Sequence, residues 1–176
     1  GYGALVIAPA DSRALVPILK KAVDQSIVVI VIDNPLNPDA EAQHGLRVPF
    51  VGADNAEGAG LIGGYIRRRL HGKGRVIILE GFTGACNGAL RKAGFSQAVT
   101  AGGGIEIVDS VRADWHSENA FTEMSKLLER HGAVDAVFCA NDQMALGVLQ
   151  ALEARRLIGK VLVAGYDNIE AVHNEL

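Results

Sequence analysis

The feature that most constrains the fold is a regular alternation between short apolar runs and stretches of helical periodicity. Seven runs rich in β-branched residues are typical of strands, and several are apolar at consecutive positions, as strands covered on both faces must be. These runs are residues 4–8, 28–32, 50–53, 75–79, 105–111, 134–140 and 161–165. The stretches with helical spacing are residues 12–25, 56–70, 91–101, 117–131, 143–155 and 170–176. This repetition predicts an α/β fold built on parallel sheets with flanking helices.

One segment breaks the alternation. Residues 34–49 contain three prolines and no long apolar run, so we expect an irregular connection there. A short strand follows, and an Asp-Asn pair then supplies a suitable N-cap for the next helix. We interpret residues 51–55 as a crossing between two lobes, with Ala53 and Asp54 at the hinge. The predicted lobes are residues 1–52 and residues 53–176.

Composition narrows the class of protein. The chain has 176 residues, of which 49% are apolar and 21% charged, as in a packed globular protein rather than a disordered one. Its net charge is −3, so the chain lacks the excess of positive charge that is typical of proteins that bind nucleic acid or an anionic membrane. No apolar run reaches the ~18 residues that a membrane span needs. Because the chain begins with Gly1 and ends inside a predicted helix, we expect it to be a piece of a longer protein.

Polar and aromatic residues follow the predicted strands. Ligands of open parallel sheets bind beyond the carboxyl ends of the strands, so these residues are the candidates for a site. Asp accepts hydrogen bonds from hydroxyls, Arg donates as a rigid fork, and Trp covers an apolar ring face. The combination suits a neutral ligand rich in hydroxyl groups. The candidate ligand contacts are Asp33, Asn34, Arg91, Trp115, Asn141 and Asp167.

Each candidate also has a structural interpretation. Asp33 and Asn34 can simply shape the turn before Pro35, and Arg91 can be a surface residue of its helix. Of Asn141 and Asp142, one is expected to cap a helix while the other faces the ligand.

Signatures of catalysis are weak. Residues 58–63 match the dinucleotide-binding pattern G-x-G-x-x-G, but four residues separate its first glycine from the preceding strand, so we expect these glycines inside a helix. There is no nucleophile elbow and no P-loop. Neither Cys86 nor Cys139 has metal-site spacing, and the histidines form no metal pair. We therefore predict a binding protein without a cofactor or metal, not an enzyme.

Six segments together resemble one family: Ala-Pro-Ala-Asp-Ser at residues 8–12, Val-Ile-Asp-Asn at 31–34, Gly-Ala-Asp-Asn at 52–55, Arg-Lys-Ala-Gly-Phe at 91–95, Ala-Asn-Asp-Gln-Met-Ala-Leu-Gly at 140–147 and Gly-Tyr-Asp at 165–167. Their order and spacing are similar to those of type I periplasmic sugar-binding proteins of the ribose-binding class, the substrate-binding subunits of ABC importers. The resemblance implies a two-lobed fold that closes on a monosaccharide or polyol. It also implies a periplasmic monomer whose partner is an ABC permease, with no direct contact to nucleic acid.

The resemblance also assigns roles to residues. It implies that Asp33 and Asn34 contact the ligand from the first lobe, and that Arg91, Trp115, Asn141 and Asp167 contact it from the second. Ribose binders of this class have arginine where this chain has Asn34, which puts ribose itself in doubt. Because the resemblance covers only the middle of such a protein, we expect an incomplete first lobe and poor sugar binding by the 176 residues alone.

Two other functions remain open at this point. The effector domain of a LacI-type transcription repressor shares the patterns at residues 91–95 and 140–147. Such repressors usually carry a Gly-His-x-x-Ile-like stretch where this chain has His-Gly-Lys-Gly-Arg-Val at residues 71–76, which favours the importer. A nicotinamide-dependent oxidoreductase would rest on residues 58–63 alone.

Overall fold

The computed structural model describes residues 1–173, and the chain forms two compact units. The N-terminal unit consists of Gly1–Asp54 together with the short segment Thr83–Asn87. The C-terminal unit consists of Asn55–Phe82 and the described residues from Gly88 onward. A single chain segment from the middle of the sequence therefore belongs with the N-terminal residues.

In the described part of the N-terminal unit, a parallel sheet has the order β1-β2-β3. Its strands are β1 (Ala4–Ile7), β2 (Val28–Ile32) and β3 (Phe50–Val51), and its helices are α1 (Val16–Asp24) and α2 (Pro38–His44). The helices bury one face of the sheet through a cluster that includes Leu19, Val29 and Val31. The other face carries Val6 and Val28, which are 59% and 58% exposed. Successive side chains of a strand point to opposite faces, so one face of this small sheet is packed and the other is open.

Helix α2 contradicts the prediction of an irregular connection over residues 34–49. Asn37 caps the helix by accepting a hydrogen bond from the Ala40 amide at 3.1 Å, and Pro38 occupies the first turn. Gly45 ends the helix in the left-handed conformation, with φ of 60°. A proline is favourable in the first turn, because the amide it lacks has no helical partner there. The prolines thus flank or begin the helix instead of excluding it.

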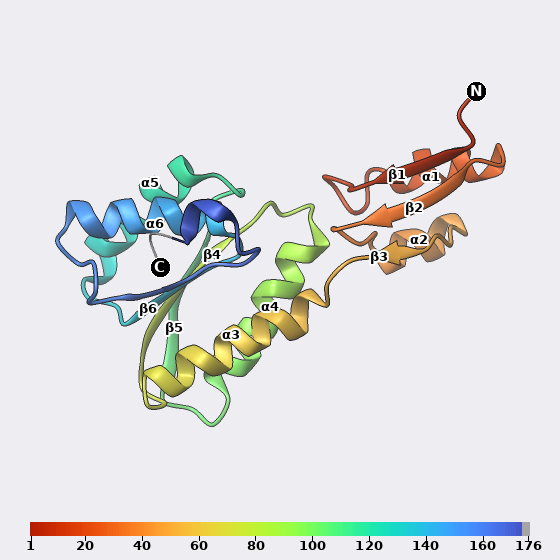
Figure 1. Ribbon diagram of the computed structural model, residues 1–176. Helices are drawn as coiled ribbons and strands as arrows, with labels where there is room; N and C mark the ends of the chain where they lie inside the picture. Colours follow the sequence, from red (N-terminus) through yellow and green to blue (C-terminus); the bar gives the residue numbers. More distant parts are fainter. Residues whose placement is uncertain (174–176) are drawn as a thin grey trace. The chain divides into compact units, whose positions relative to one another are not determined.

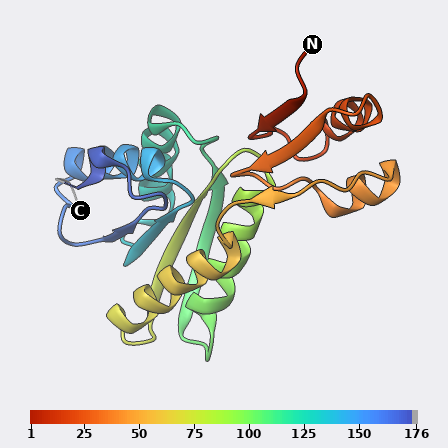
Figure 2. The same ribbon diagram turned by 45° about the vertical axis from the view of Figure 1, so that its right-hand side comes forward.

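Within residues 55–173, the C-terminal unit contains a parallel sheet of order β5-β4-β6-β7. Its strands are β4 (Gly74–Glu80), β5 (Ile105–Arg112), β6 (Ala136–Cys139) and β7 (Leu162–Ala164). Helices α3 (Asn55–Arg69) and α4 (Cys86–Thr100) lie side by side on one face, and α5 (Ser117–His131) and α6 (Asp142–Ala154) cover the other (Figures 1 and 2). The predicted α/β fold with parallel sheets and flanking helices is confirmed.

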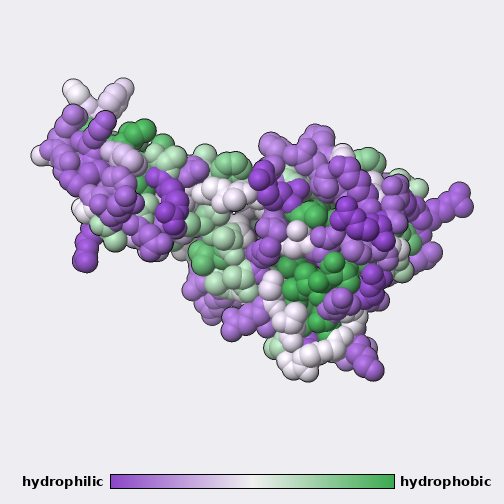
Figure 3. All heavy atoms as spheres, turned by 180° about the vertical axis from the view of Figure 1, so that it is seen from behind, coloured by the Kyte–Doolittle hydropathy of each residue, from purple (hydrophilic) through white to green (hydrophobic). Residues whose placement is uncertain are grey.

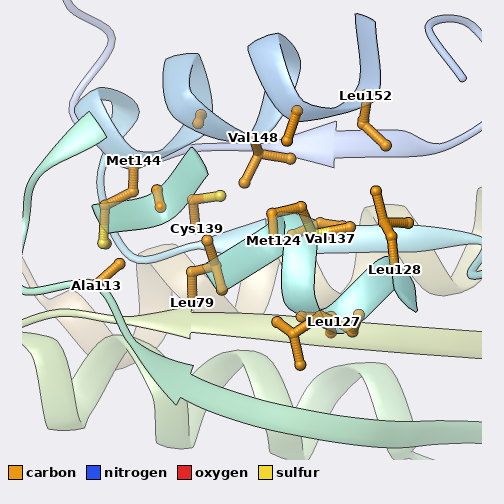
Figure 4. Close-up of a cluster of buried hydrophobic side chains, with 14 of the residues drawn as sticks. Leu79, Ala113, Met124, Leu127, Leu128, Val137, Cys139, Met144, Val148 and Leu152 are labelled. Carbon is orange, nitrogen blue, oxygen red and sulfur yellow. The ribbon is translucent and has the colours of Figure 1, made fainter. Parts of the chain in front are cut away.

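The sheet separates two hydrophobic cores. Ile77 and Leu79 of β4 point into the core beneath α5 and α6, whereas Val76 and Ile78 point into the core beneath α3 and α4. Figure 4 shows the first core, in which side chains from α5 and α6 meet those of β4 and β6. In the second, the rings of Phe95 and Phe138 stack with centroids 4.2 Å apart. This two-sided burial explains why the strands of this unit are apolar at consecutive positions.

Some predicted helix boundaries move. Helix α1 begins at residue 16 rather than 12, and α4 begins at residue 86, five residues before its predicted start. The helix predicted over residues 170–176 is a short 3₁₀ turn, η1 (Glu170–Val172), and residues 174–176 lie outside the described residues.

Among the described residues, no helix is both long and apolar enough to cross a bilayer. Apolar atoms nevertheless reach the surface in patches among hydrophilic ones (Figure 3).

The glycines of the G-x-G-x-x-G pattern all lie inside α3, and two of them, Gly58 and Gly63, allow close contacts. A Cβ on Gly63 would lie 2.6 Å from the carbonyl oxygen of Phe95, and a Cβ on Gly94 would lie 2.0 Å from that of Ala56. These distances are shorter than any real Cβ contact, so α3 and α4 can pack this tightly only because both carry glycine. The pattern therefore lies inside a helix, as predicted, and its last glycine, Gly63, allows that helix to pack closely on α4.

Candidate functional site

The centre of the candidate site is Arg91, a charged residue that is only 5% exposed. Its Nε donates to Asn55 Oδ1 at 2.8 Å, and its Nη1 donates to the carbonyl oxygen of Ala140 at 2.7 Å. Its Nη2 lies 3.1 Å from Asp167 Oδ1. The guanidinium group thus joins the start of α3, the end of β6 and the segment after β7. A buried charge persists only when it is paired in this way.

Two aromatic rings lie near the Arg91 guanidinium. Its central carbon is 3.9 Å from the ring centre of Tyr166 and 5.8 Å from that of Trp115. Both distances are within the range of cation–π attraction. Tyr166 is not among the predicted contacts, although it directly follows a predicted strand. A Cβ on Gly58 would lie 2.4 Å from the Tyr166 hydroxyl, so the first glycine of the pattern in α3 makes room for this ring.

Trp115 lies in an unusual turn after β5. Both Asp114 and Trp115 adopt positive φ values, 53° and 72°. Arg112 holds the Asp114 carboxylate through two hydrogen bonds of 3.1 Å each. Left-handed backbone at a residue other than glycine costs about 1–3 kcal/mol and is concentrated at functional sites. The backbone of this turn is therefore strained, and the strained turn carries the Trp115 ring to its position near Arg91.

Asn141 and Asp142 both have structural partners. Asn141 Oδ1 caps α6 by accepting from the Met144 amide at 2.9 Å, and Asn141 Nδ2 donates to the Trp115 carbonyl oxygen at 3.4 Å. Asp142 is buried and accepts from the Ile169 amide at 2.9 Å. Asn141 is thus the residue of the pair that caps the helix, and it also supports the turn that carries Trp115.

The candidates of the N-terminal unit differ from each other. Asp33 is exposed and has a positive φ of 60°. Asn34 is 2% exposed, and its Nδ2 donates to the Pro9 carbonyl oxygen at 2.7 Å. Its Oδ1 accepts from the Ser12 hydroxyl at 3.2 Å and from the Asn87 amide at 3.0 Å. The Asn34 amide therefore ties three loops together instead of standing open at the edge of the sheet.

The structure thus brings Arg91, Trp115, Asn141 and Asp167 together at the carboxyl ends of the strands of the C-terminal unit. Asp33 and Asn34 follow β2 in the N-terminal unit. Ala53 and Asp54, the predicted hinge residues, are exposed and lie between β3 and α3. Within residues 1–173, no group of three or more histidine, cysteine, aspartate or glutamate residues could hold a metal ion.

A hollow of about 460 Å³ lies beside this cluster in the C-terminal unit. It is lined by Ile62, Asp142, Gly165, Tyr166, Asp167, Asn168 and Val172. The lining combines carboxylate and amide groups with an aromatic ring, so it can offer both hydrogen bonds and apolar contact to a small polar molecule.

Glu80, the last residue of β4, supports the same end of the sheet. Its Oε1 accepts from Lys92 Nζ at 2.7 Å and from the Ser110 hydroxyl at 2.6 Å. Partial burial acts to raise the pKa of the Glu80 carboxyl, but the hydrogen bonds from Lys92 and Ser110 outweigh burial and hold this pKa below its ordinary value. A carboxyl with a lowered pKa stabilises the fold above its unfolded pKa, and this stabilisation is lost as the pH falls through the folded pKa.

We therefore expect the Glu80→Gln variant to lose less stability than the parent as the pH falls below the ordinary pKa of a glutamate carboxyl. The measurement is the free energy of unfolding by urea at a series of pH values. The Glu106→Gln variant, at an exposed position of β5, is the control. Identical acid dependence in the parent and the Glu80→Gln variant would contradict the prediction.

Comparisons with known proteins agree on one kind of relative. A model of the periplasmic binding protein domain matches residues 1–175. The D-ribose/D-allose-binding protein of Pseudomonas aeruginosa is 44% identical over 172 residues, which cover 98% of this chain and 54% of the relative. The D-allose-binding periplasmic protein of Escherichia coli is 33% identical over 170 residues, which cover 96% of this chain and 55% of the relative. The chain spans about half the length of the curated relatives it matches.

Solved structures give the same result. An ABC transporter solute-binding protein from Burkholderia multivorans superposes with a TM-score of 0.95 at 42% identity, covering 99% of this chain and 61% of that protein. A periplasmic solute-binding protein from Actinobacillus succinogenes with bound D-allose superposes with a TM-score of 0.90 at 37% identity, covering 96% and 60%. None of the relatives named here is a repressor or a nicotinamide-dependent oxidoreductase.

Proposed function

Because the chain belongs to the periplasmic binding protein domain family, we propose that it is the sugar-recognising part of a solute-binding protein that serves an ABC importer. The observation that carries this proposal is the buried Arg91, held by Asn55, Ala140 and Asp167 between two aromatic rings. The Arg91 guanidinium is already held in one orientation, so its hydrogen-bond donors lose little conformational entropy when a ligand binds.

The proposed division of labour follows from the chemistry of the cluster. Arg91 donates to sugar hydroxyl or ring oxygens, and Asp167, whose side chain is 40% exposed, accepts from hydroxyls. Trp115 covers the apolar C–H face of the sugar ring. Asp33, which follows β2, is proposed to accept from a further sugar hydroxyl. Asn34 and Asn141 act by holding loops and the turn of Trp115 in place.

The proposed ligand is a pentose or hexose in its ring form. The named relatives include proteins described as binding D-ribose and D-allose, and the hydroxyl-matching groups of this chain suit the same class. In this proposal the sugar is bound and released without any reaction. The protein acts in the periplasm as a monomer and delivers the sugar to a membrane permease.

A chimeric protein tests the proposal. In it, these 176 residues replace the matched segment of the Pseudomonas aeruginosa D-ribose/D-allose-binding protein, so that the site is tested within a protein of the relatives' full length. We expect calorimetric titration to give an affinity for D-ribose or D-allose within about tenfold of that of the parent protein. The 176-residue chain alone is titrated in parallel and is expected to bind far more weakly.

The fold of the chimera is checked first by circular dichroism and a cooperative thermal transition. A folded chimera that binds neither sugar, nor any other member of a panel of pentoses, hexoses and inositols, would overturn the proposed function. Binding of an amino acid instead of a sugar would do the same.

A further inference from the structure

Two glycines lie directly against the ring of Trp115, the only tryptophan of the chain. A Cβ on Gly81 would lie 2.1 Å from both Cζ2 and Cη2 of the ring, and a Cβ on Gly88 would lie 3.0 Å from Cη2. Neither glycine has the left-handed φ that would itself require glycine. The ring, not the backbone conformation, therefore accounts for the lack of a side chain at residue 81, and it leaves little room for one at residue 88.

The backbone that carries the ring is fixed on its other sides. The fork of Arg112 holds the Asp114 carboxylate, and Asn141 Nδ2 donates to the Trp115 carbonyl oxygen. The turn itself is strained, with positive φ at two consecutive residues. Because the backbone is held in this way, a methyl group on Gly81 would have to displace the ring instead of the turn.

We propose that Gly81 is a positioning residue for sugar recognition: by leaving room for the Trp115 ring, it sets the plane of that ring beside Arg91. The ring is then poised for the apolar face of a sugar in its ring form. This inference rests on the proposed function, but the position of the ring can be tested without any sugar. Gly81 and Gly88 differ in how closely they approach the ring, so substitutions at the two positions provide a graded series.

The first test uses the fluorescence of Trp115 in the 176-residue chain. We expect Gly81→Ala to shift the emission maximum and to raise the acrylamide quenching constant, because the ring leaves its partly buried place. Gly88→Ala is expected to have a smaller effect in the same direction. Gly60→Ala is the matched control: its Cβ would meet only the Gly94 carbonyl oxygen, at 3.7 Å, and emission should not change.

Thermal melts show which variants fold. If Gly81→Ala does not fold, the comparison of Gly88→Ala with Gly60→Ala decides the question. Unchanged emission and quenching in the folded Gly81→Ala variant, or in Gly88→Ala if only that variant folds, would overturn the inference.

The second test measures D-ribose and D-allose binding by the chimera. Overpacking by one methyl group is expected to lower the affinity of Gly81→Ala by about tenfold. Trp115→Phe removes the part of the ring that the new methyl group would meet, so the double variant Gly81→Ala/Trp115→Phe should regain affinity relative to Gly81→Ala. Losses that simply multiply in the double variant would contradict the inference. A parent chimera that binds no sugar would instead refute the proposed function, whatever the fluorescence shows.

Discussion

Replacing Arg91 with alanine is expected to lower the sugar affinity of the chimera by roughly 10- to 200-fold, which corresponds to about 1.5–3 kcal/mol for hydrogen bonds to a charged group. The alanine cannot donate to the ligand, and it also leaves Asp167 and the Ala140 carbonyl oxygen without the partner they have in the parent. Isothermal titration calorimetry with D-ribose and D-allose measures the loss.

The Arg91→Lys variant separates charge from geometry. Lysine keeps the positive charge but cannot donate to Asn55, Ala140 and Asp167 from one rigid fork, so we expect most of the affinity to be lost here as well. Urea unfolding of both variants reports how much of the change reflects stability. Unchanged affinity in a folded Arg91→Ala chimera would remove Arg91 from the site.

The largest expected effect on stability follows from Phe138→Ala. Phe138 is completely buried in β6, and its ring stacks on that of Phe95. Truncation of a buried phenylalanine removes its transfer free energy and leaves a cavity, so we expect the free energy of unfolding to fall by about 3–5 kcal/mol. Urea unfolding of the 176-residue chain, followed by far-UV circular dichroism, measures this loss.

Phe121→Ala is the matched control, because it removes the same group from a position of α5 that is 38% exposed. We expect it to cost less than about 1 kcal/mol. Equal losses for the two variants would show that the stacked pair is not a core contact of the folded protein.

Much of the fold could be predicted because the apolar pattern records burial directly. The run Val76–Leu79 is apolar at every position because alternate residues enter different cores. Helix α5 was predicted with its observed bounds, since Met124, Leu127 and Leu128 share one buried stripe. Helix α2 was missed because its prolines were interpreted as breakers, although Asn37, Pro38 and Gly45 together are a set of helix start and stop signals.

The candidate site was predictable to a smaller extent. The position of a residue after a strand indicates which edge of the sheet it occupies. Arg91, Trp115 and Asp167 lie at the edge that the sequence predicts, beyond the carboxyl ends of the strands. It does not indicate which way a side chain turns or what it bonds to. The sequence therefore could not show that the Asn34 side chain is buried and hydrogen-bonded to other loops. It also could not show that the Tyr166 ring stacks on the Arg91 guanidinium.

The segment Thr83–Asn87 limits how the chain can be divided. It is flanked on both sides by residues of the C-terminal unit, yet its Cys86 amide donates to the Ser12 hydroxyl and its Asn87 amide donates to Asn34. A polypeptide that ended at residue 54 would lack the Asn87 amide. The buried side-chain oxygen of Asn34, Oδ1, would then lose one of its two hydrogen-bond donors and keep the Ser12 hydroxyl. The two units consequently cannot be separated by cleaving one peptide bond, and an autonomous N-terminal fragment would need a substitute for these five residues.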